Sequence, residues 1–386
     1  MILSQLNPTR FVALLICPPD GELQRKARVH NVSCVNVQQL TARFTWKVRT
    51  LVRYLLSFVS TIREVRARVR KHEPDLIHAN SVRAGLVMSA ATLGLRIPIV
   101  WHVHDLLLHH PLSTCIRTAV LLHPPTRIVV VANAAAERFK GKLLRPFPRR
   151  VRIDVVYNAV AAAELSGNTS SIRKELRLRG NDRLIGLVGN LSPVKGQLEL
   201  LRAFAKVRQQ VPGAALLIVG STLFNRDDGY QQQLHAEVRS LGLEPHVRFL
   251  GQRDDVPAIM SELDLLVLNS RSEAFPLVAL EGMTAGVPVL ATAVGGLPEL
   301  IMPAENGLLI PFGDEAKLIE AIQLLLKRPG FSGDLARRAR EHVTQNYSVS
   351  KFVSSFEAIY TAVVQKPLPA GNERLALSSS TTLTNV

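Results

Sequence analysis

Short apolar runs rich in β-branched residues alternate with amphipathic stretches along most of the chain. Runs of this length predict buried strands, and the stretches between them predict helices that cover both faces of parallel sheets. The fold class is therefore α/β. The predicted strands of the first half lie at residues 11–16, 32–37, 76–79, 97–101, 127–131 and 151–156. Those of the second half lie at 184–188, 214–219, 247–250, 265–268, 288–291 and 308–310.

The alternation is interrupted at one polar stretch, residues 161–183, whose centre reads SGNTSS. We interpret this stretch as a linker between two Rossmann-like domains, residues 1–160 and residues 184–346. A chain of 386 residues is long enough for two domains of this kind.

The end of the chain has a helical part and a polar part. Apolar side chains at Phe352, Phe356 and Tyr360 are spaced for one helix face, so a last packed helix is predicted within residues 347–366. Residues 367–386 are rich in Ser and Thr near their end and are predicted to be disordered.

Two glutamates, Glu273 and Glu281, are the most informative polar residues of the chain. Glu273 closes the polar loop after the predicted strand at 265–268. Glu281 lies on a helix predicted to begin at Pro276 and to end at Gly286. The carboxyl end of a strand in an open α/β sheet is where ligands bind, so this loop and helix are the candidate site.

The chemistry of this segment favours a nucleotide sugar as the ligand. The first amides of the helix, those of Leu277 and Val278, can bind diphosphate oxygens. Carboxylates accept hydrogen bonds from pairs of hydroxyl groups, so one glutamate suits ribose and the other suits the sugar. Taken alone, the spacing of two glutamates also fits an ordinary solvated helix.

The whole segment resembles the signature of the retaining glycosyltransferases of family 4, S-E-x-F-P-L-V-x-L-E-x-M-x-x-G-x-P-V followed by G-G-x-P-E. The matching residues are Ser272, Glu273, Phe275, Pro276, Glu281, Gly286, Pro288, Gly295, Gly296, Pro298 and Glu299. The resemblance extends from about residue 2 to residue 365 and is stronger in the second half. It implies the GT-B fold, in which two Rossmann-like domains face each other across a cleft and the last helix returns to the first domain.

A second motif, GNLSPVKG, begins at Gly189 and resembles the G-R-L-x-x-x-K-G of this family. The resemblance places Lys195 on the donor phosphates, where a cation stabilises a leaving diphosphate. The short motif alone also fits a solvated lysine. Asn190 stands where the family has Arg and carries no charge, so phosphate stabilisation is expected to be weaker, or shared with Arg271 or Arg253.

The first domain contributes the sequence WHVHD, in which His102 and His104 point to the same side of a strand. It resembles a strand of the family that ends in His-Asp, with the histidine beside the transferred sugar. His104 is predicted to take this role, and His102 is the second candidate. A third ligand at useful spacing is missing, so no metal site is predicted. Asn80 replaces the second histidine of a D-I-I-H-A-H-S motif.

Two further segments match parts of the same family, and a third lies in the region expected for the base. VYNAV resembles a V-x-N-G-V hinge, with Ala159 in place of a glycine that is free to adopt positive φ. The Gly295-Gly296 turn is predicted to form one wall of the nucleotide pocket, or to be simply a turn. Arg248 and the loop 251–255 lie where the base is expected, and no base preference follows from them.

Basic residues are concentrated in the first half of the chain. Residues 1–160 contain 24 Lys and Arg against 8 Asp and Glu, whereas the remaining residues are balanced. Between Arg43 and Lys71 nine basic side chains occur with Glu64 as the single acid, interleaved with aromatic residues. A basic amphipathic helix with aromatic side chains is typical of a surface for anionic lipid, and an anionic acceptor is the other interpretation. No motif supports binding to nucleic acid.

Cysteine usage and the amino terminus favour a cytoplasmic protein. Cys17, Cys34 and Cys115 are far apart and odd in number, which fits reduced thiols. The start, MILSQLNPTR, lacks the features of a secretory signal, and no apolar run is long enough to span a membrane. Peripheral attachment to the inner face of a membrane is compatible with this composition.

The beginning of the chain departs from the family. Members of the family start with a strand and a glycine-rich loop, whereas residues 2–11 read as the end of a helix that leads into the second strand. In a sheet of order 3-2-1-4-5-6 the first strand is central, so its neighbours are expected to lack their partner. We interpret the sequence as lacking roughly 30 residues, about one strand–loop–helix unit. The alternative is a naturally shortened protein.

The resemblance implies a metal-independent, retaining glycosyltransferase of the hexosyltransferase type that uses no cofactor and takes a UDP- or GDP-type sugar. By resemblance, Glu281 holds the ribose, Glu273 the sugar, and Lys195 the diphosphate. Gly189, Asn190 and Phe275 are also predicted to contact the donor. The acceptor is expected to be a glycan or a lipid-linked molecule of cell-surface polysaccharide or glycolipid synthesis. The alternative is a non-catalytic relative that binds a nucleotide or a membrane.

Overall fold

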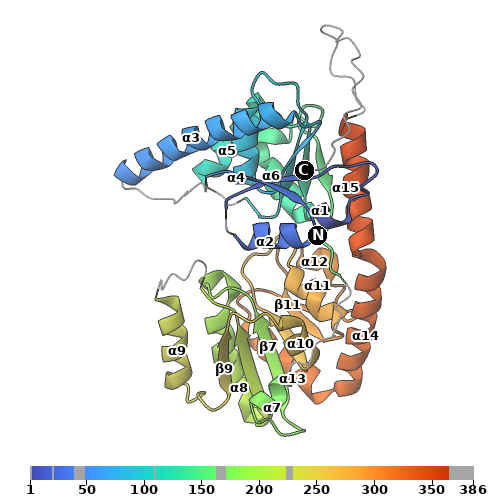
Figure 1. Cartoon of the computed structure of the whole chain (residues 1–386). Coiled ribbons are helices and arrows are strands. Elements are labelled where there is room, and N and C mark those ends of the chain that lie inside the picture. The colour runs from blue at the N-terminus through green and yellow to red at the C-terminus, as the bar shows by residue number, and fades with distance from the viewer. Residues whose placement is uncertain are drawn as a thin grey trace.

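The computed structural model describes residues 2–19, 21–38, 48–107, 110–161, 171–222 and 229–364. Within these residues the chain forms two α/β domains, one above the other in Figure 1. All strand pairs in both domains are parallel, as the alternation of strands and helices predicts.

The first domain is the upper one in Figure 1. Its helices are α1 (Ile2–Gln5), α2 (Glu22–Val29), α3 (Val48–His72), α4 (Val82–Ala91), α5 (Pro111–Leu122) and α6 (Asn133–Leu144). Its strands are β1 (Leu14–Cys17), β2 (Ser33–Asn36), β3 (Ile77–Ala79), β4 (Ile99–Val103), β5 (Arg127–Val130) and β6 (Ile153–Val155).

The second domain is built around one six-stranded sheet of order β12-β11-β10-β7-β8-β9. Its strands are β7 (Arg183–Val188), β8 (Ala214–Val219), β9 (Val247–Gly251), β10 (Leu265–Leu268), β11 (Val289–Thr292) and β12 (Leu308–Ile310). Its helical segments are α7 (Ile172–Glu175), η1 (Pro193–Lys195), α8 (Gln197–Gln210), α9 (Tyr230–Ser240), α10 (Val256–Ser261), α11 (Leu277–Thr284), α12 (Leu297–Leu300), α13 (Glu315–Lys327) and α14 (Pro329–Asn346).

Burial on both faces explains the composition of these strands. Every residue of β10, sequence LLVL, is buried, because helices cover both faces of the sheet. Each of the predicted strands is present, and the prediction differs from the structure mainly at the ends. The largest difference is at β1, which begins at Leu14 rather than at residue 11, and Val12 before it is 99% exposed.

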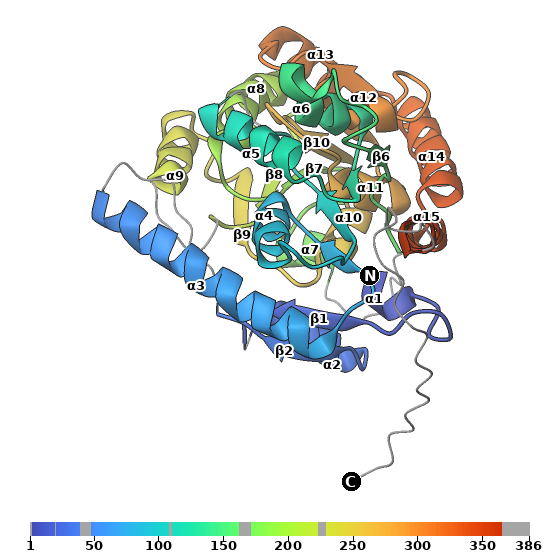
Figure 2. The same ribbon diagram turned by 90° about the horizontal axis from the view of Figure 1, so that it is seen from above.

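The sheet of the first domain is divided. In the described residues, β1 pairs with β2 alone, and a separate sheet has the order β3-β4-β5-β6. Figure 2 shows β1 and β2 together with α2 and α3 at one side of the domain. The division lies between β1 and β3, where the sequence predicts that neighbouring strands lack their partner.

The last helix joins the two domains. Helix α14 runs along the second domain, and α15 (Val349–Val364) continues upward onto the first (Figure 1). Phe352, Phe356 and Tyr360 of α15 pack in one buried cluster with Val100 of β4 and Val129 of β5. The predicted return of this helix to the first domain is therefore confirmed, whereas residues 365–386 lie outside the described part of the chain.

The predicted linker is too long at its second end. Residues 162–170 are outside the described chain, but from Ser171 onward the segment belongs to the second domain. The Ser171 hydroxyl donates a hydrogen bond of 2.6 Å to Oε2 of Glu262, and the Arg173 guanidinium binds Asp264 beside it. Polar composition alone does not separate a linker from a charged segment that packs on a domain through ion pairs.

Candidate functional site

The candidate site lies where the strand order of the second domain reverses. From β7 the chain continues to β8 on one side of the sheet, whereas β10 pairs with β7 on the other side. In open α/β sheets, a ligand site forms outside the carboxyl ends of the two strands at such a point. The loop that follows β7 holds Gly189 and Asn190, and the loop that follows β10 leads to Glu273.

An ion pair joins these two loops. Nζ of Lys195 lies 2.6 Å from Oε1 of Glu273, and the Ser270 hydroxyl donates a hydrogen bond of 2.6 Å to the same oxygen. The Glu273 side chain is 10% exposed and that of Lys195 is 24% exposed, so water screens the pair only weakly. The structure thus brings together two residues that the sequence predicted separately, one for the phosphates and one for the sugar.

Backbone contacts fix the two loops against each other. The amide of Arg271 donates a hydrogen bond of 2.7 Å to the carbonyl of Val194, and Nδ2 of Asn269 donates one of 3.0 Å to the carbonyl of Gly196. Gly196 has a φ of +66°, and a Cβ there would lie 2.0 Å from the Asn269 carbonyl oxygen. Only glycine fits at this position, and its turn places Lys195 opposite Glu273.

The Gly295-Gly296 turn supports Glu273 from behind. The amide of Gly296 donates a hydrogen bond of 3.3 Å to the Glu273 carbonyl, and a Cβ on Gly295 would lie 1.6 Å from that oxygen. The same Cβ would lie 3.2 Å from Cδ1 of Leu106, two residues after His104. The turn therefore holds the backbone of Glu273 and is also a point where the two domains meet.

Helix α11 begins beside this loop. Its first residues are Leu277 and Val278, one position later than the start predicted at Pro276, and their amides lack intrahelical acceptors by position. Glu281 lies one turn further along α11, and burial raises the pKa of its carboxyl. The amides and the Glu281 carboxyl thus belong to one short helix next to Glu273, as the sequence predicted.

Phe275 packs between the donor loop and the hinge. It was expected to contact the donor, but its side chain is buried, with its ring centroid 5.0 Å from that of Tyr157 and 5.5 Å from that of Tyr347. Its carbonyl accepts a hydrogen bond of 2.8 Å from Nδ2 of Asn158 in the predicted hinge. Phe275 thus packs the donor loop against the hinge, since the aromatic partners come from outside the motif.

His104 is positioned by Asn80. His104 follows β4, Asn80 follows β3, and Nε2 of His104 donates a hydrogen bond of 2.9 Å to Oδ1 of Asn80. Burial lowers the pKa of His104, so the ring is neutral near pH 7 and its Nδ1 is an acceptor. The replacement of a histidine by Asn80 therefore has a structural consequence that the sequence did not reveal.

His102, the second candidate, is a packing residue. It is buried against Phe356, and neither ring nitrogen has a hydrogen-bond partner in the described structure. Burial, followed by the neighbouring His104 and His78, keeps its pKa far below the usual range. Across the described residues, no group of His, Cys, Asp and Glu is arranged to hold a metal ion.

The positions around Asn190 contribute little side-chain chemistry. Gly189 has a φ of +150°, and the Asn190 carbonyl accepts a hydrogen bond of 2.9 Å from Nε2 of Gln197. Of the two arginines proposed to share the phosphate charge, Arg253 is paired with Asp255 at 2.7 Å, which gives no support for a role in the site. Arg271 lies over the ring of Phe312 and remains close to the Lys195 loop through its backbone.

Glu299 has a role that the sequence analysis missed. Its carboxylate accepts hydrogen bonds of 2.8 Å from the amides of Asn133 and Ala134, the first two residues of α6 in the other domain. The preceding residue, Ala132, has no side chain able to cap this helix. The Tyr157 hydroxyl donates a further bond of 2.9 Å to Glu299. A carboxylate of the second domain therefore caps a helix of the first, and its place in the G-G-x-P-E motif was the available signal.

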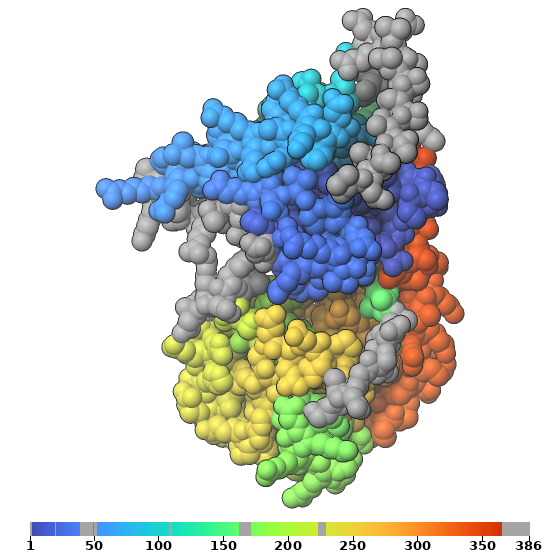
Figure 3. Space-filling view, in the orientation of Figure 1, coloured from blue at the N-terminus to red at the C-terminus, as the bar shows by residue number. Residues whose placement is uncertain are grey.

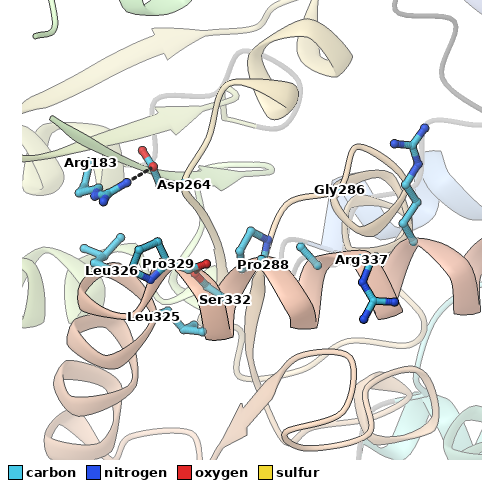
Figure 4. Close-up of a pocket in the computed structure, with 12 residues that line it drawn as sticks. Arg183, Asp264, Gly286, Pro288, Leu325, Leu326, Pro329, Ser332 and Arg337 are labelled. Carbon is cyan, nitrogen blue, oxygen red and sulfur yellow. Dashed lines mark hydrogen bonds and ion pairs between the residues drawn. The ribbon is translucent and has the colours of Figure 1, made fainter. Parts of the chain in front are cut away.

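A cavity of about 410 Å³ lies away from this site (Figure 4). Arg183 and Asp264, joined by a bond of 3.0 Å, line it together with Pro329 and Arg337 of α14. Arg183 begins β7 and Asp264 precedes β10, so the cavity is at the amino ends of the strands. The candidate site is at the opposite edge of the sheet.

Two family profiles match the chain. The profile described as "Glycosyl transferases group 1" matches residues 168–342, and that described as "Glycosyltransferase Family 4" matches residues 11–164. Between them they account for both domains. The chain therefore belongs to the family 4 glycosyltransferases of GT-B fold, as the signature motifs predicted.

Curated relatives have related names. N-acetyl-alpha-D-glucosaminyl L-malate synthase of Bacillus anthracis is 33% identical over 215 residues, which are 55% of this chain and 54% of that protein. The chain thus matches about half the length of that relative. D-inositol 3-phosphate glycosyltransferase of Salinispora arenicola is 28% identical over 388 residues, covering 92% of this chain and 82% of that protein.

Solved structures share the whole fold. HepE of Anabaena, in complex with UDP-glucose, is 25% identical with a TM-score of 0.78, and 94% of each chain is covered. A glycosyltransferase from Rickettsia africae has a TM-score of 0.77 at 16% identity, over 95% of this chain and 94% of that one, and shows likeness of fold alone.

Proposed function

We propose that this chain is a retaining glycosyltransferase of the hexosyltransferase type, which moves a sugar from a nucleotide diphosphate sugar to a glycan or lipid-linked acceptor without a metal ion. The Lys195–Glu273 ion pair, at the point where the strand order reverses, is the observation on which the proposal rests. It places one cation and one carboxylate beside the free amides of a helix start, which are the groups needed for phosphates and hydroxyls.

The donor is proposed to lie along this edge of the sheet. Its diphosphate meets Lys195 and the amides of Leu277 and Val278, and its ribose hydroxyls meet Glu281. Both described bonds of Glu273 end on Oε1, which leaves Oε2 as the acceptor for a hydroxyl of the sugar. The UDP-glucose complex of HepE, 25% identical to this chain, supports a UDP-type donor, and a GDP-type donor uses the same phosphate and ribose contacts.

The reaction needs stabilisation of the leaving group. Transfer breaks the bond between the anomeric carbon and a diphosphate oxygen and forms a bond to an acceptor oxygen, so negative charge develops on the diphosphate. Lys195 and the start of α11 oppose this charge in a position that is largely closed to water. The neutral His104 ring, held by Asn80, supplies an acceptor for a hydroxyl near the reacting carbon.

The acceptor is proposed to carry negative charge. The names of the two relatives described above include an acidic molecule, malate in one and inositol 3-phosphate in the other. In this chain all of the net charge of +16 lies in residues 1–160, the domain opposite the donor site. A glycan or lipid-linked acceptor with phosphate or carboxylate groups, as in cell-surface polysaccharide or glycolipid synthesis, suits this domain.

The second candidate function is a non-catalytic relative that binds nucleotides. The divided sheet of the first domain favours it, since β1 and β3 do not pair in the described residues. Release of UDP or GDP from a panel of nucleotide sugars, with and without acceptors, distinguishes the two. Turnover in chelator with unchanged anomeric configuration by NMR supports the proposal. Nucleotide binding without turnover for every donor and acceptor contradicts it.

A further inference from the structure

Helix α3 consists of a packed half and a free half. In its second half Thr61, Val65 and Val69 are buried, and Nη1 of Arg66 donates hydrogen bonds of 2.7 and 2.8 Å to the carbonyls of Ala91 and Leu93. Its first half extends beyond the body of the first domain, as Figure 1 and Figure 2 show, and the projection is also visible in the space-filling view of Figure 3.

The free half exposes large apolar side chains. Four of them are between 45% and 67% exposed, namely Val52, Leu55, Leu56 and Val59. Their spacing of i, i+3, i+4 and i+7 places them on one face of the helix. Four large apolar residues exposed as one stripe indicate a binding surface rather than scattered surface residues.

Basic side chains continue and flank this apolar stripe. Arg63 follows Val59 by four residues and Arg70 follows Arg63 by seven, so they extend the same face toward the packed half, and both are exposed. Arg49 and Arg53 lie beside the apolar stripe and are also exposed. The solvent-facing surface of α3 is therefore apolar in the free half. Arginines lie beside this apolar part and also follow it toward the packed half.

This arrangement matches an anionic bilayer. The interface of such a bilayer offers hydrocarbon to the apolar side chains and phosphate groups to the arginines at the same depth. A second copy of the chain would bring the arginines of both copies together, and nucleic acid offers no hydrocarbon for Leu55 and Leu56. None of the described helices is long and apolar enough to cross a membrane. An apolar stripe flanked by arginines on one helix face suits a contact in the plane of the bilayer interface.

We propose that the exposed stripe of α3, Val52 to Arg70, docks the first domain on an anionic lipid bilayer. Docking leaves the helix folded, because its packed half is already anchored by Arg66 and the buried valines. The contact does not depend on sugar transfer, so it is measured as binding and stands or fails separately from the catalytic proposal.

The test is co-sedimentation of the full chain with vesicles of phosphatidylglycerol and phosphatidylcholine, compared with phosphatidylcholine alone. The wild-type chain is expected to bind the anionic vesicles preferentially and to be released by salt. Leu55→Ser with Leu56→Ser is expected to weaken binding about tenfold or more. Arg49→Ser with Arg53→Ser is expected to weaken it similarly and to reduce its salt dependence.

Matched controls remove the same kinds of side chain elsewhere. Leu122→Ser on α5 removes a side chain that is 62% exposed, and Arg239→Ser on α9 removes an exposed arginine of the second domain; both are expected to bind as the wild type does. Circular dichroism confirms that each variant is folded. Wild-type binding by the double leucine variant overturns the proposal. Failure of the wild-type chain to bind anionic vesicles also overturns it. In that case sedimentation velocity shows whether the stripe instead joins two copies in a dimer that the double leucine variant abolishes.

Discussion

Nζ of Lys195 lies 2.6 Å from Oε1 of Glu273, and this contact joins the loops that follow two neighbouring strands of the second domain. The two side chains are largely withdrawn from water, so each stabilises the charge of the other. A bound diphosphate competes with Glu273 for the same ammonium. The pair therefore links stability of the free protein to binding of the donor.

Replacement of Lys195 tests this link. Lys195→Ala is expected to weaken nucleotide-sugar binding by about 10- to 100-fold, because hydrogen bonds to charged groups contribute roughly 1.5–3 kcal/mol. It also leaves the Glu273 carboxylate without its cation, so the free energy of unfolding is expected to fall by about 1–3 kcal/mol. Calorimetric titration and urea unfolding measure the two effects.

A double variant separates the effects. Lys195→Ala with Glu273→Gln is expected to regain most of the stability lost in Lys195→Ala alone without regaining donor affinity. Lys206→Ala, which breaks an exposed pair with Glu315 of 3.0 Å, is the control and is expected to change stability by about 0–1 kcal/mol. If the losses of stability in Lys195→Ala and Glu273→Gln, each measured alone, add up to the loss in the double variant, the two side chains are not coupled.

The Glu281 carboxyl makes donor binding sensitive to pH. Burial raises its pKa, so it takes up a proton at a higher pH than an ordinary glutamate as the pH falls. The protonated form is a poorer acceptor for ribose hydroxyls, and donor affinity is expected to decrease through this range. Glu281→Gln is expected to give weak binding that no longer changes with pH, whereas Glu320→Gln on the exposed side of α13 retains the wild-type profile.

The Glu281 carboxyl is also expected to make the stability of the protein depend on pH. The folded protein holds this proton more tightly than the unfolded chain, so the contribution of Glu281 to the free energy of unfolding rises as the pH falls through its raised pKa. Above that pKa the buried charge is unfavourable. Glu281→Gln is thus expected to raise the Tm of the ligand-free protein near pH 7, and a lower Tm would contradict this electrostatic account.

Glu299 is expected to hold the two domains together through its contact with α6. Glu299→Ala removes the cap of α6 and is expected to cost about 0.5–2 kcal/mol of stability, together with the contact between the domains. Small-angle X-ray scattering is expected to show a larger radius of gyration. Asp314→Ala removes a helix cap within the second domain, where Oδ1 of Asp314 accepts a hydrogen bond of 3.0 Å from the amide of Lys317. This variant is expected to lower stability without expanding the molecule. Equal expansion in both variants would exclude a special role for Glu299.

The pair of Asn80 and His104 predicts a shift in the pH profile of turnover. Asn80→Asp adds a carboxylate beside the ring, which raises the pKa of His104 and moves the acid limb of the profile to higher pH. Asp105→Asn is expected to move it the other way, because Asp105 raises that pKa in the native protein. An unchanged profile in both variants would mean that His104 does not act in the reaction.

The strands and the position of the site were predictable because local physical rules determine them. Buried parallel strands need continuous apolar runs, and β10 with its four buried residues is an example. A helix start also has recognisable residues, so α11 and Glu281 were found within one position. The spacing of three aromatic residues on one face predicted the helix α15, and the family resemblance predicted its return to the first domain.

The contacts that were missed join residues far apart in the sequence. Lys195 and Glu273 are 78 positions apart, and Glu299 lies more than 160 positions from the helix that it caps. No periodicity links such residues, so their partners appear only when the domains are packed together. The packing of Phe275 was missed for the same reason, since its partners Tyr157 and Tyr347 come from the hinge and the end of α14.

A structure of the chain with a bound UDP- or GDP-sugar is the most direct test of the central claim. The diphosphate is expected against Lys195 and the first amides of α11, with the ribose hydroxyls on Glu281 and the sugar near Glu273. A nucleotide bound elsewhere, for example in the cavity at the amino ends of the strands beside Arg337, would contradict the account.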